Sequence, residues 1–337
     1  MKIANLRGPR DLVIEDLTLD TQNLGPDDVW GETEITGFKI GTDRGNYEGA
    51  ENVPGAPDYP RWVGDSNLAA IKAVGSNVTK FKPGDRVISR APHTSDWIQN
   101  QNGPLVKVPD GVDSEDAVWA HLYTLSGLCY RKANFVPGEY VAVVGLGVLG
   151  LGAIGLGPAM GARTIGIGNS PIRNDMAMRM GAHATFLYND RDLTSKLHEY
   201  TNGSGVDLVI LTANPWPAYR TSVEIVRDNG RVSIVSLLGR GEDDLDFNPL
   251  AMQYFYHKSL SLIAVNGTSG YLYPSSDSDR FEWNKQCEFV LQLMADGNLN
   301  PSQLITHRLH YTQMIEAYEM AYEREKTMLG VVFTWKD

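Results

Sequence analysis

The chain has 337 residues, a net charge of −11 and a hydrophobic content of 42%. This composition is typical of a folded protein, the length predicts two domains, and the acidic balance argues against a nucleic-acid partner. Only Cys129 and Cys287 are present, which excludes a disulfide scaffold and a four-cysteine zinc site. No apolar run is long enough to span a membrane and no signal-peptide pattern begins the chain, so we expect a cytoplasmic protein.

Short strands broken by glycine and proline turns are predicted up to about Val108. Examples of these strands are Val29–Ile35, Leu68–Val74 and Arg86–Ile88. The pattern predicts an all-β, barrel-like domain. A helix capped by Ser114-Glu115-Asp116 is expected next, running from Ala117 to about Ala133.

Strands and helices alternate after Pro137-Gly138. The predicted strands are Val141–Val144, Thr164–Ile167, Asp207–Leu211, Arg231–Ser236 and Ser261–Val265. The predicted helices between them are Val148–Met160, Arg173–Met180, Leu193–Tyr200 and Ala218–Val226. This alternation predicts a doubly wound parallel sheet. Two further helices, near Trp283–Met294 and Tyr311–Arg324, and a final strand, Gly330–Trp335, complete the predicted elements.

The first of these strands runs directly into a G-x-G-x-x-G motif formed by Gly145, Gly147 and Gly150. In this context the first glycine permits the tight turn, the second lets a pyrophosphate approach the backbone, and the third allows close packing of helix on strand. The helix start, which includes Val148 and Leu149, offers amides and a dipole that favour phosphate. We therefore predict dinucleotide binding here.

The order of the parts resembles the medium-chain dehydrogenase/reductase superfamily, in its sorbitol- and threonine-dehydrogenase-like branch. The segments that carry the resemblance are Gly41-Thr42-Asp43, Lys82-Pro83-Gly84-Asp85-Arg86-Val87, Val136-Pro137-Gly138-Glu139, Met180-Gly181-Ala182, Asp228-Asn229-Gly230-Arg231-Val232 and Phe247-Asn248-Pro249-Leu250. The resemblance implies an α/β protein, with a GroES-like β-barrel catalytic domain (1–125), a Rossmann nucleotide-binding domain (126–267) and a return to the catalytic domain (268–337). It also implies a homodimer or homotetramer acting on a small molecule.

The residues after the second Rossmann strand bear on the choice of cofactor. NAD enzymes place an acid there to bind the ribose hydroxyls, but Gly168 stands near that position. Asn169 and Ser170 can donate hydrogen bonds, and Arg173 can pair with a 2′-phosphate. We therefore predict NADP in preference to NAD. The alternative is that Asn169-Ser170-Pro171 only caps the following helix.

Further cofactor contacts are predicted from the carboxyl ends of the parallel strands, where ligands of such sheets bind. The candidates are Thr212, Ser236, Leu238 and Asn266.

The metal ligands that the resemblance implies are replaced in this chain. Ile40 stands in the place of a cysteine, and Gly64-Asp65-Ser66 stands in the place of a G-H-E segment. His121 falls near the third ligand. Because isoleucine has no donor atom, a three-ligand catalytic zinc is not expected, although an Asp65–His121 metal pair is the alternative.

Four residues are the candidates for catalysis without zinc: Thr42, Asp43, Asp65 and His121. The resemblance implies that the Thr42 hydroxyl bonds the substrate oxygen and relays its proton. A protonated His121 would replace the metal as the acid, oriented by Asp43 or Asp65. Alternatively, Asp43 holds backbone amides, Thr42 caps the turn and His121 is a half-buried structural residue.

Arg44, Tyr47, Trp62 and His93 are predicted to contact the substrate, with loop or core positions as the alternative. The chain is thus expected to be an NADP-dependent, zinc-independent oxidoreductase acting on a small polar alcohol or ketone such as a polyol, cyclitol or sugar derivative. A zinc-free reductase of enone or quinone C=C bonds is the second possibility. A non-catalytic nucleotide-binding protein is the third.

Overall fold

The computed structural model describes residues 1–49, 58–240, 242–243, 245, 247–266 and 282–336. The chain forms two units. The first unit contains Met1–His121, Trp283–Gly297 and Leu304–Asp337, and the second contains Leu122–Glu282 and Asn298–Gln303. The first unit is therefore built from both ends of the chain. The predicted division after residue 125 lies close to the boundary after His121.

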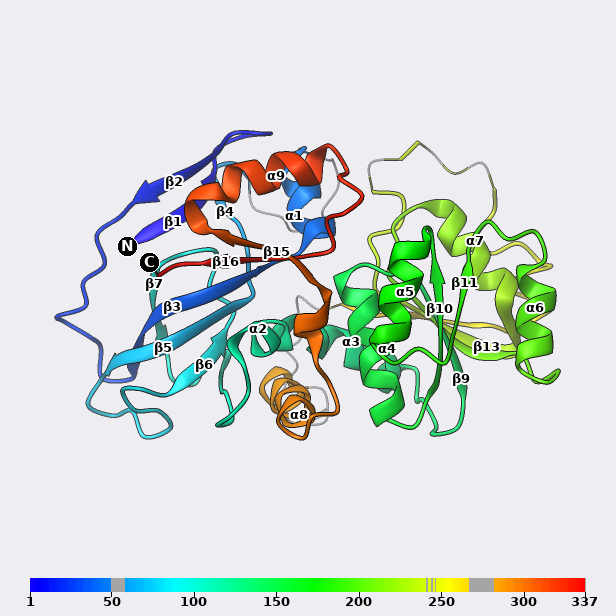
Figure 1. Cartoon of the computed structure of the whole chain (residues 1–337), viewed down its shortest axis with the longest axis horizontal. Helices are drawn as coiled ribbons and strands as arrows, with labels where there is room; N and C mark the ends of the chain where they lie inside the picture. The colour runs from blue at the N-terminus through cyan, green and yellow to red at the C-terminus, as the bar shows by residue number, and fades with distance from the viewer. Residues whose placement is uncertain (50–57, 241, 244, 246, 267–281, 337) are drawn as a thin grey trace. The chain divides into compact units, whose positions relative to one another are not determined.

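The first unit is a GroES-like β-structure (Figure 1). Its strands are β1 (Lys2–Leu6), β2 (Leu12–Asp16), β3 (Asp28–Phe38), β4 (Arg61–Trp62), β5 (Asn67–Val74), β6 (Arg86–Ser89), β7 (Asp96–Asn100), β8 (Leu105–Lys107), β15 (Ile305–His310) and β16 (Gly330–Thr334). In the described residues, seven strands form one sheet in the order β15-β16-β3-β5-β6-β8, with β7 also paired to β3, and β2-β1-β4 form another. The long strand β3 alternates buried and partly exposed residues until Ile35, as a half-buried strand should.

Two predictions of local structure near the first unit need correction. Gly41-Thr42-Asp43 is not an isolated turn but lies in helix α1 (Ile40–Tyr47), which two low-propensity glycines conceal in the sequence. The helix expected from Ala117 to Ala133 is two helices, α2 (Ser114–Ala117) and α3 (Ala120–Lys132). The cap of α2 is Asp113, whose carboxylate accepts a 2.9 Å hydrogen bond from the amide of Glu115.

The rest of the first unit is helical and comes from the end of the chain. It comprises α8 (Trp283–Ala295), the 3₁₀ turn η3 (Tyr311–Gln313) and α9 (Met314–Tyr322); another 3₁₀ turn, η2 (Pro301–Leu304), precedes β15. Helix α9 packs on α1. Aromatic side chains fill the space between them, with Tyr318 0% exposed and its ring 5.3 Å from that of Tyr47. The Tyr47 hydroxyl also donates a hydrogen bond to Glu319, which lies 272 residues further along the chain. The core of this unit therefore depends on contacts between the two ends of the chain.

The second unit is a Rossmann domain, as predicted (Figure 1). Its strands are β9 (Tyr140–Val144), β10 (Arg163–Gly168), β11 (Ala184–Leu187), β12 (Val206–Leu211), β13 (Val226–Ile234) and β14 (Ser261–Ala264). Its helices include α4 (Val148–Ala159), α5 (Pro171–Arg179), α6 (Leu193–Tyr200) and α7 (Trp216–Ile225). The described strands are all parallel, in the order β11-β10-β9-β12-β13-β14. The strand order reverses between β9 and β12, which is where such sheets bind dinucleotides.

Close packing explains why helix α4 is rich in glycine. A Cβ on Gly152 would lie 2.4 Å from the ring of Tyr123, and one on Gly157 would lie 2.1 Å from the Thr164 methyl group. The neighbouring helix α3 is tied to α4 because the Tyr130 hydroxyl donates a 2.7 Å hydrogen bond to the carbonyl of Ala153. The cost of interior glycine is therefore offset by the approach of α3 and β10 to this helix.

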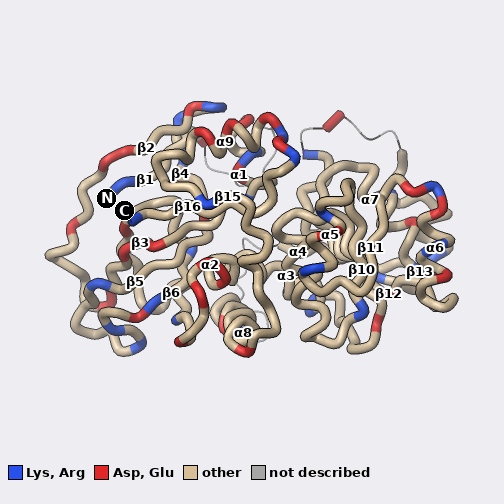
Figure 2. Tube along the Cα trace, viewed as in Figure 1, with Lys and Arg blue, Asp and Glu red and all other residues tan. Residues whose placement is uncertain are grey.

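Charged residues of both signs are interspersed along both units (Figure 2). No helix in the described part of the chain is both long and apolar enough to cross a membrane.

Candidate functional site

The turn between β9 and α4 has the geometry that dinucleotide binding requires. Gly145 has a φ of +101°, which side chains other than glycine rarely adopt. A Cβ on Gly150 would lie 1.9 Å from the carbonyl oxygen of Gly145, so only glycine allows this packing of helix on strand. By contrast, a Cβ on Gly147 would meet nothing within 4 Å. Gly147 therefore borders open space at the N-terminus of α4, where the amides from Val148 onward lack intrahelical partners.

Thr212 follows β12 and stabilises this turn. Its hydroxyl donates a 2.7 Å hydrogen bond to the carbonyl oxygen of Gly145. The structure thus shows a supporting role for Thr212, at the point where the strand order reverses. Ser236 follows β13, and its Oγ is buried without a hydrogen-bond partner in the described structure. Leu238 packs against the hydrophobic core of the second unit, and Asn266 is exposed after β14.

The end of β10 differs from that of an NAD-binding domain. Gly168 is buried, and a Cβ there would lie 2.0 Å from Oδ1 of Asn174, so the present packing leaves no room for an acidic side chain. Asn169 is exposed. Ser170 is the N-cap residue of α5, but its hydroxyl makes no capping hydrogen bond. The alternative that these residues only cap the helix therefore does not account for the Ser170 side chain.

Arg173 connects α5 to the glycine-rich turn. Its Nη1 donates a 2.8 Å hydrogen bond to the carbonyl of Leu146. Burial lowers the pKa of Arg173, yet a guanidinium stays protonated in proteins. The described structure assigns no further hydrogen bond to its remaining N–H groups. A fixed positive charge therefore lies next to the phosphate-binding turn, with donors left over for an anion.

A second polar cluster lies in the first unit and contains three of the four predicted catalytic residues. Oδ2 of Asp65 lies 3.4 Å from Nε2 of His121 and accepts a 2.5 Å hydrogen bond from Nζ of Lys39. Burial alone would raise the pKa of Asp65, but the charge of Lys39 and the hydrogen bonds from His121 and Lys39 hold this pKa well below its ordinary value. Asp65 is therefore an anion, and its Oδ1 is buried without a hydrogen-bond partner.

The structure corrects the prediction of a protonated His121. The indole Nε1 of Trp283 donates a 2.9 Å hydrogen bond to Nδ1 of His121. Because an indole N–H can only donate, Nδ1 must carry a lone pair, and the neutral ring then bears its proton on Nε2, facing Asp65. Burial also lowers the pKa of His121, against the influence of Asp65. His121 is neutral at pH 7 because it is 8% exposed and its Nδ1 is engaged.

Asp43 is 2% exposed at the start of α1. Its Oδ2 accepts a 2.8 Å hydrogen bond from the backbone amide of Lys39, the N-cap residue of that helix. The alternative role of holding a backbone amide is thus present in the structure. Burial raises the pKa of Asp43 to about 7, an effect that nearby Asp65 adds to and Lys39 opposes.

Thr42 occupies the exposed face of α1, and its hydroxyl makes no hydrogen bond within the described residues. It is therefore available to a ligand. The alternative in which Thr42 caps the turn has no hydrogen bond to support it.

The four predicted substrate residues fall in different environments. Tyr47 is 1% exposed and its hydroxyl donates to Glu319, so this residue belongs to the core. His93 is 0% exposed, with Nδ1 2.8 Å from the hydroxyl of Thr36, and burial lowers its pKa to about 3. Trp62 is exposed on β4, and Arg44 pairs with Glu48. The structure does not support a substrate role for Tyr47 or His93, whose polar groups lie in the interior.

Sequence reasoning missed Lys39 and Trp283. Lys39 directly precedes Ile40, so a search for charged groups beside the replaced metal position would have found it. Trp283 has no such signal, because it lies 162 residues from His121.

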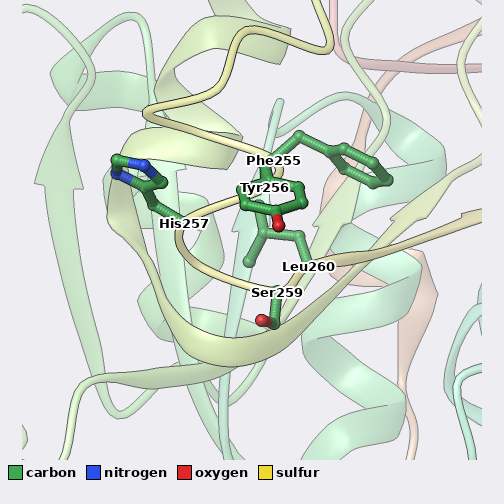
Figure 3. A pocket seen from close by; sticks show the side chains of 5 residues that line it. All are labelled: Phe255, Tyr256, His257, Ser259 and Leu260. Atoms are coloured by element: carbon green, nitrogen blue, oxygen red, sulfur yellow. The ribbon is translucent and has the colours of Figure 1, made fainter.

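A separate hollow of about 580 Å³ occurs in the second unit (Figure 3). It is lined by Phe255, Tyr256, His257, Ser259 and Leu260. None of these residues belongs to the predicted sites, and they show no convergent set of charged groups. We assign no function to this hollow.

Comparisons with known proteins agree with this architecture. The zinc-binding dehydrogenase family model matches residues 148–277. Sorbitol dehydrogenase from Bacillus subtilis (strain 168) is 23% identical, covering 98% of this chain and 96% of the relative. The alcohol dehydrogenase TADH from Thermus sp. ATN1 has the same fold over 100% of both chains, with a TM-score of 0.81 and 20% identity. The chain is therefore similar, over nearly its whole length, to members of the medium-chain dehydrogenase/reductase superfamily.

These comparisons support a dehydrogenase or reductase activity for the chain. Another relative, the NADP-dependent isopropanol dehydrogenase from Thermoanaerobacter brockii, is 31% identical over 53% of this chain and 61% of its own length. The glycine-rich turn described above fits the dinucleotide of the superfamily, since the open space at Gly147 is what a pyrophosphate needs.

The residues at the replaced metal positions do not fit the catalytic zinc that part of this superfamily uses. No group of three or more His, Cys, Asp or Glu side chains able to hold a metal occurs among the described residues. Ile40 offers no donor atom. The carboxylate of Asp65 is already engaged by the ammonium group of Lys39, which has no lone pair to give a metal. These residues therefore do not form a three-ligand zinc site.

Proposed function

We propose that this chain is an NADP-dependent, zinc-independent oxidoreductase that transfers hydride between nicotinamide and a small polar alcohol or ketone, such as a polyol, cyclitol or sugar derivative. One observation supports the proposal above all. Arg173 lies against the glycine-rich turn with N–H groups to spare, and Asn169 and Ser170, rather than a carboxylate, directly follow β10. A guanidinium binds a 2′-phosphate by charge-assisted hydrogen bonds, whereas an acid there would repel it.

In this proposal the second unit holds the cofactor. The backbone around Gly147 and the N-terminus of α4 bind the pyrophosphate, and Asn169, Ser170 and Arg173 bind the ribose with its 2′-phosphate. Ser236 and Asn266 bind the nicotinamide half. Bound NADPH would supply the hydride.

The first unit supplies the polar groups for the substrate. Hydride transfer to a carbonyl carbon leaves negative charge on its oxygen, which hydrogen-bond donors in a partly desolvated site stabilise. Thr42 offers an exposed hydroxyl, and the Lys39–Asp65–His121 cluster offers donors and an acceptor side by side. These groups suit a substrate with several hydroxyl groups better than an apolar one.

An absorbance assay that follows NADPH consumption or formation tests this function. Purified protein is offered polyols and cyclitols with NADP⁺, and ketones and enones with NADPH, each repeated with the NAD forms. We expect turnover of polar alcohols or ketones with the NADP forms. Turnover of enones alone would establish the C=C reductase instead. Tight NADPH binding without turnover of any class would favour the non-catalytic nucleotide-binding protein.

We further propose that the protein is a homodimer or homotetramer, as the resemblance to its superfamily implies. Light scattering coupled to gel filtration gives the molar mass directly. A mass near 37.2 kDa, that of one chain, would contradict this part of the proposal.

A further inference from the structure

Building on the proposed function, we propose that the ammonium group of Lys39 polarises the carbonyl oxygen of the substrate and donates the proton to it, and that Asp65 is the positioning residue that holds this ammonium in place. The positively charged ammonium group of Lys39 thus takes the place of the metal ion beside the substrate oxygen. No comparison assigns a role to this residue.

The burial and bonding of Lys39 indicate that a ligand is missing from its surroundings. Its side chain is only 15% exposed, compared with 43% for Lys72 and 42% for Lys2, which pair with carboxylates on the surface. An ammonium group has three N–H donors, and the described structure gives Lys39 one partner, Oδ2 of Asp65 at 2.5 Å. Two donors of a largely buried cation are therefore left for an oxygen atom that is not part of the protein.

Asp65 shows the complementary deficiency. Its Oδ2 receives Lys39 and faces His121, while its Oδ1 is buried without a partner. A substrate hydroxyl could accept a hydrogen bond from Lys39 and donate one to Oδ1, satisfying both groups. A buried acceptor without a partner costs free energy, so a ligand that supplies the missing hydrogen bond is bound more tightly.

The other titratable groups of the cluster are less suited to be the acid. His121 is neutral, because its Nδ1 already accepts the hydrogen bond from Trp283. Asp43 accepts a hydrogen bond from the Lys39 backbone amide and is 2% exposed. The charge of Arg90 also acts on His121, but a guanidinium does not release its proton in proteins. Lys39 is the member of this set that has both a positive charge and a transferable proton.

In the direction of reduction, bound NADPH would supply a hydride to the carbonyl carbon. As the C–H bond forms and the π electron pair of C=O moves to oxygen, an N–H bond of Lys39 breaks and its proton forms the O–H bond. The products are the alcohol, NADP⁺ and a neutral Lys39 amine, which regains a proton from water. Asp65 remains an anion throughout.

Four variants test this inference. Lys39→Met removes the charge but leaves Asp65 without its partner, which could destabilise the fold. The double variant Lys39→Met/Asp65→Asn removes both charges and avoids that problem. Lys39→Ala leaves space for an added amine. Lys72→Met is the matched control, since Lys72 belongs to the same unit and pairs with Glu32 at 3.2 Å.

Two measurements are made on full-length protein that shows native circular dichroism and binds NADPH with unchanged affinity. The first is kcat/KM for the carbonyl compound that the wild type reduces fastest. Loss of a general acid and of charge stabilisation predicts a decrease of about 10²–10⁴-fold for Lys39→Met and the double variant, and no change for Lys72→Met. Ethylamine should restore part of the activity of Lys39→Ala, an effect that a merely structural role would not produce.

The second measurement does not depend on turnover. Acetate is used as an anionic probe, titrated into the NADP⁺ complex and followed by calorimetry. We expect acetate to bind the wild type and Lys72→Met equally, and at least tenfold more weakly to Lys39→Met and the double variant. Equal acetate affinity in all variants, or no acetate binding to the wild type, would overturn the assignment of Lys39. Absence of turnover with any alcohol, ketone or enone would instead refute the proposed function.

Discussion

The indole of Trp283 donates a 2.9 Å hydrogen bond to Nδ1 of His121, across 162 residues of chain. This bond selects the neutral tautomer with its proton on Nε2, which lies 3.4 Å from Asp65. A residue expected to act as an acid is thereby held in the form that cannot do so.

Replacing Trp283 with phenylalanine is expected to raise the pKa of His121. Without the indole donor, Nδ1 becomes free to take up a proton, and the charge of Asp65 favours the imidazolium. NMR titration of the histidine ring signals measures this pKa. Trp62→Phe is the control, because Trp62 is 60% exposed. An unchanged His121 titration in Trp283→Phe would show that the indole does not determine the tautomer.

Asp43 predicts a dependence of stability on pH. Its pKa is raised from 3.8 to about 7 by burial, so between these values the unfolded chain loses a proton that the folded chain keeps. The contribution of Asp43 to stability is therefore fully present at low pH and is lost as the pH rises through about 7. Asp43→Asn keeps an oxygen to accept the Lys39 amide but does not ionise.

Urea unfolding of wild type and Asp43→Asn at several pH values between 5 and 8 measures this effect. The difference in the free energy of unfolding should move in favour of the variant by about 3 kcal/mol over that range. Asp16→Asn is the control, since Asp16 is exposed and its pKa is lowered by Lys2. A difference between wild type and Asp43→Asn that does not vary with pH would contradict the raised pKa.

Two glycines of the fingerprint turn should respond differently to alanine. Gly147→Ala adds a methyl group to open space, so stability should be retained while the Kd for NADPH rises at least tenfold. Gly150→Ala places a Cβ 1.9 Å from the Gly145 carbonyl, and overpacking of this kind costs about 1–3 kcal/mol or more. Thermal unfolding and NADPH fluorescence separate the two effects. Normal NADPH binding by Gly147→Ala would rule out the assigned place of the pyrophosphate.

Arg173→Ala is expected to discriminate between the two cofactors. A charge-assisted hydrogen bond to the 2′-phosphate is worth about 1.5–3 kcal/mol, so the Kd for NADPH should rise at least tenfold. The Kd for NADH should change much less, although loss of the bond to Leu146 will affect both. Arg179→Ala, on the exposed face of the same helix, is the control. Equal weakening of NADPH and NADH would assign Arg173 a supporting role only.

Metal analysis checks the zinc-free proposal. Protein purified without chelators should contain less than about 0.1 zinc per chain, because Asp65 and His121 lack the third ligand that a catalytic zinc needs. Activity should also survive dialysis against EDTA. One tightly held zinc per chain, with activity lost on its removal, would refute zinc independence.

The sequence by itself predicted the Rossmann unit in some detail. The strands around Val141–Val144 and Thr164–Ile167, the helix Leu193–Tyr200 and the turn at Gly145 all follow from local signals, namely apolar runs, their spacing and the glycines between them. Helix α1 was not predicted, also for a local reason, because its two glycines lower the helix propensity of the segment.

Only the tertiary structure decided which groups of the polar cluster are charged. Lys39, Asp65, His121 and Trp283 come from four separate stretches of chain, and their protonation depends on burial and on partners that folding brings together. Local sequence specifies where a strand ends or a helix begins, because those events involve neighbouring residues. The protonation state of His121 depends on an indole 162 residues away, and a local sequence pattern cannot predict that contact.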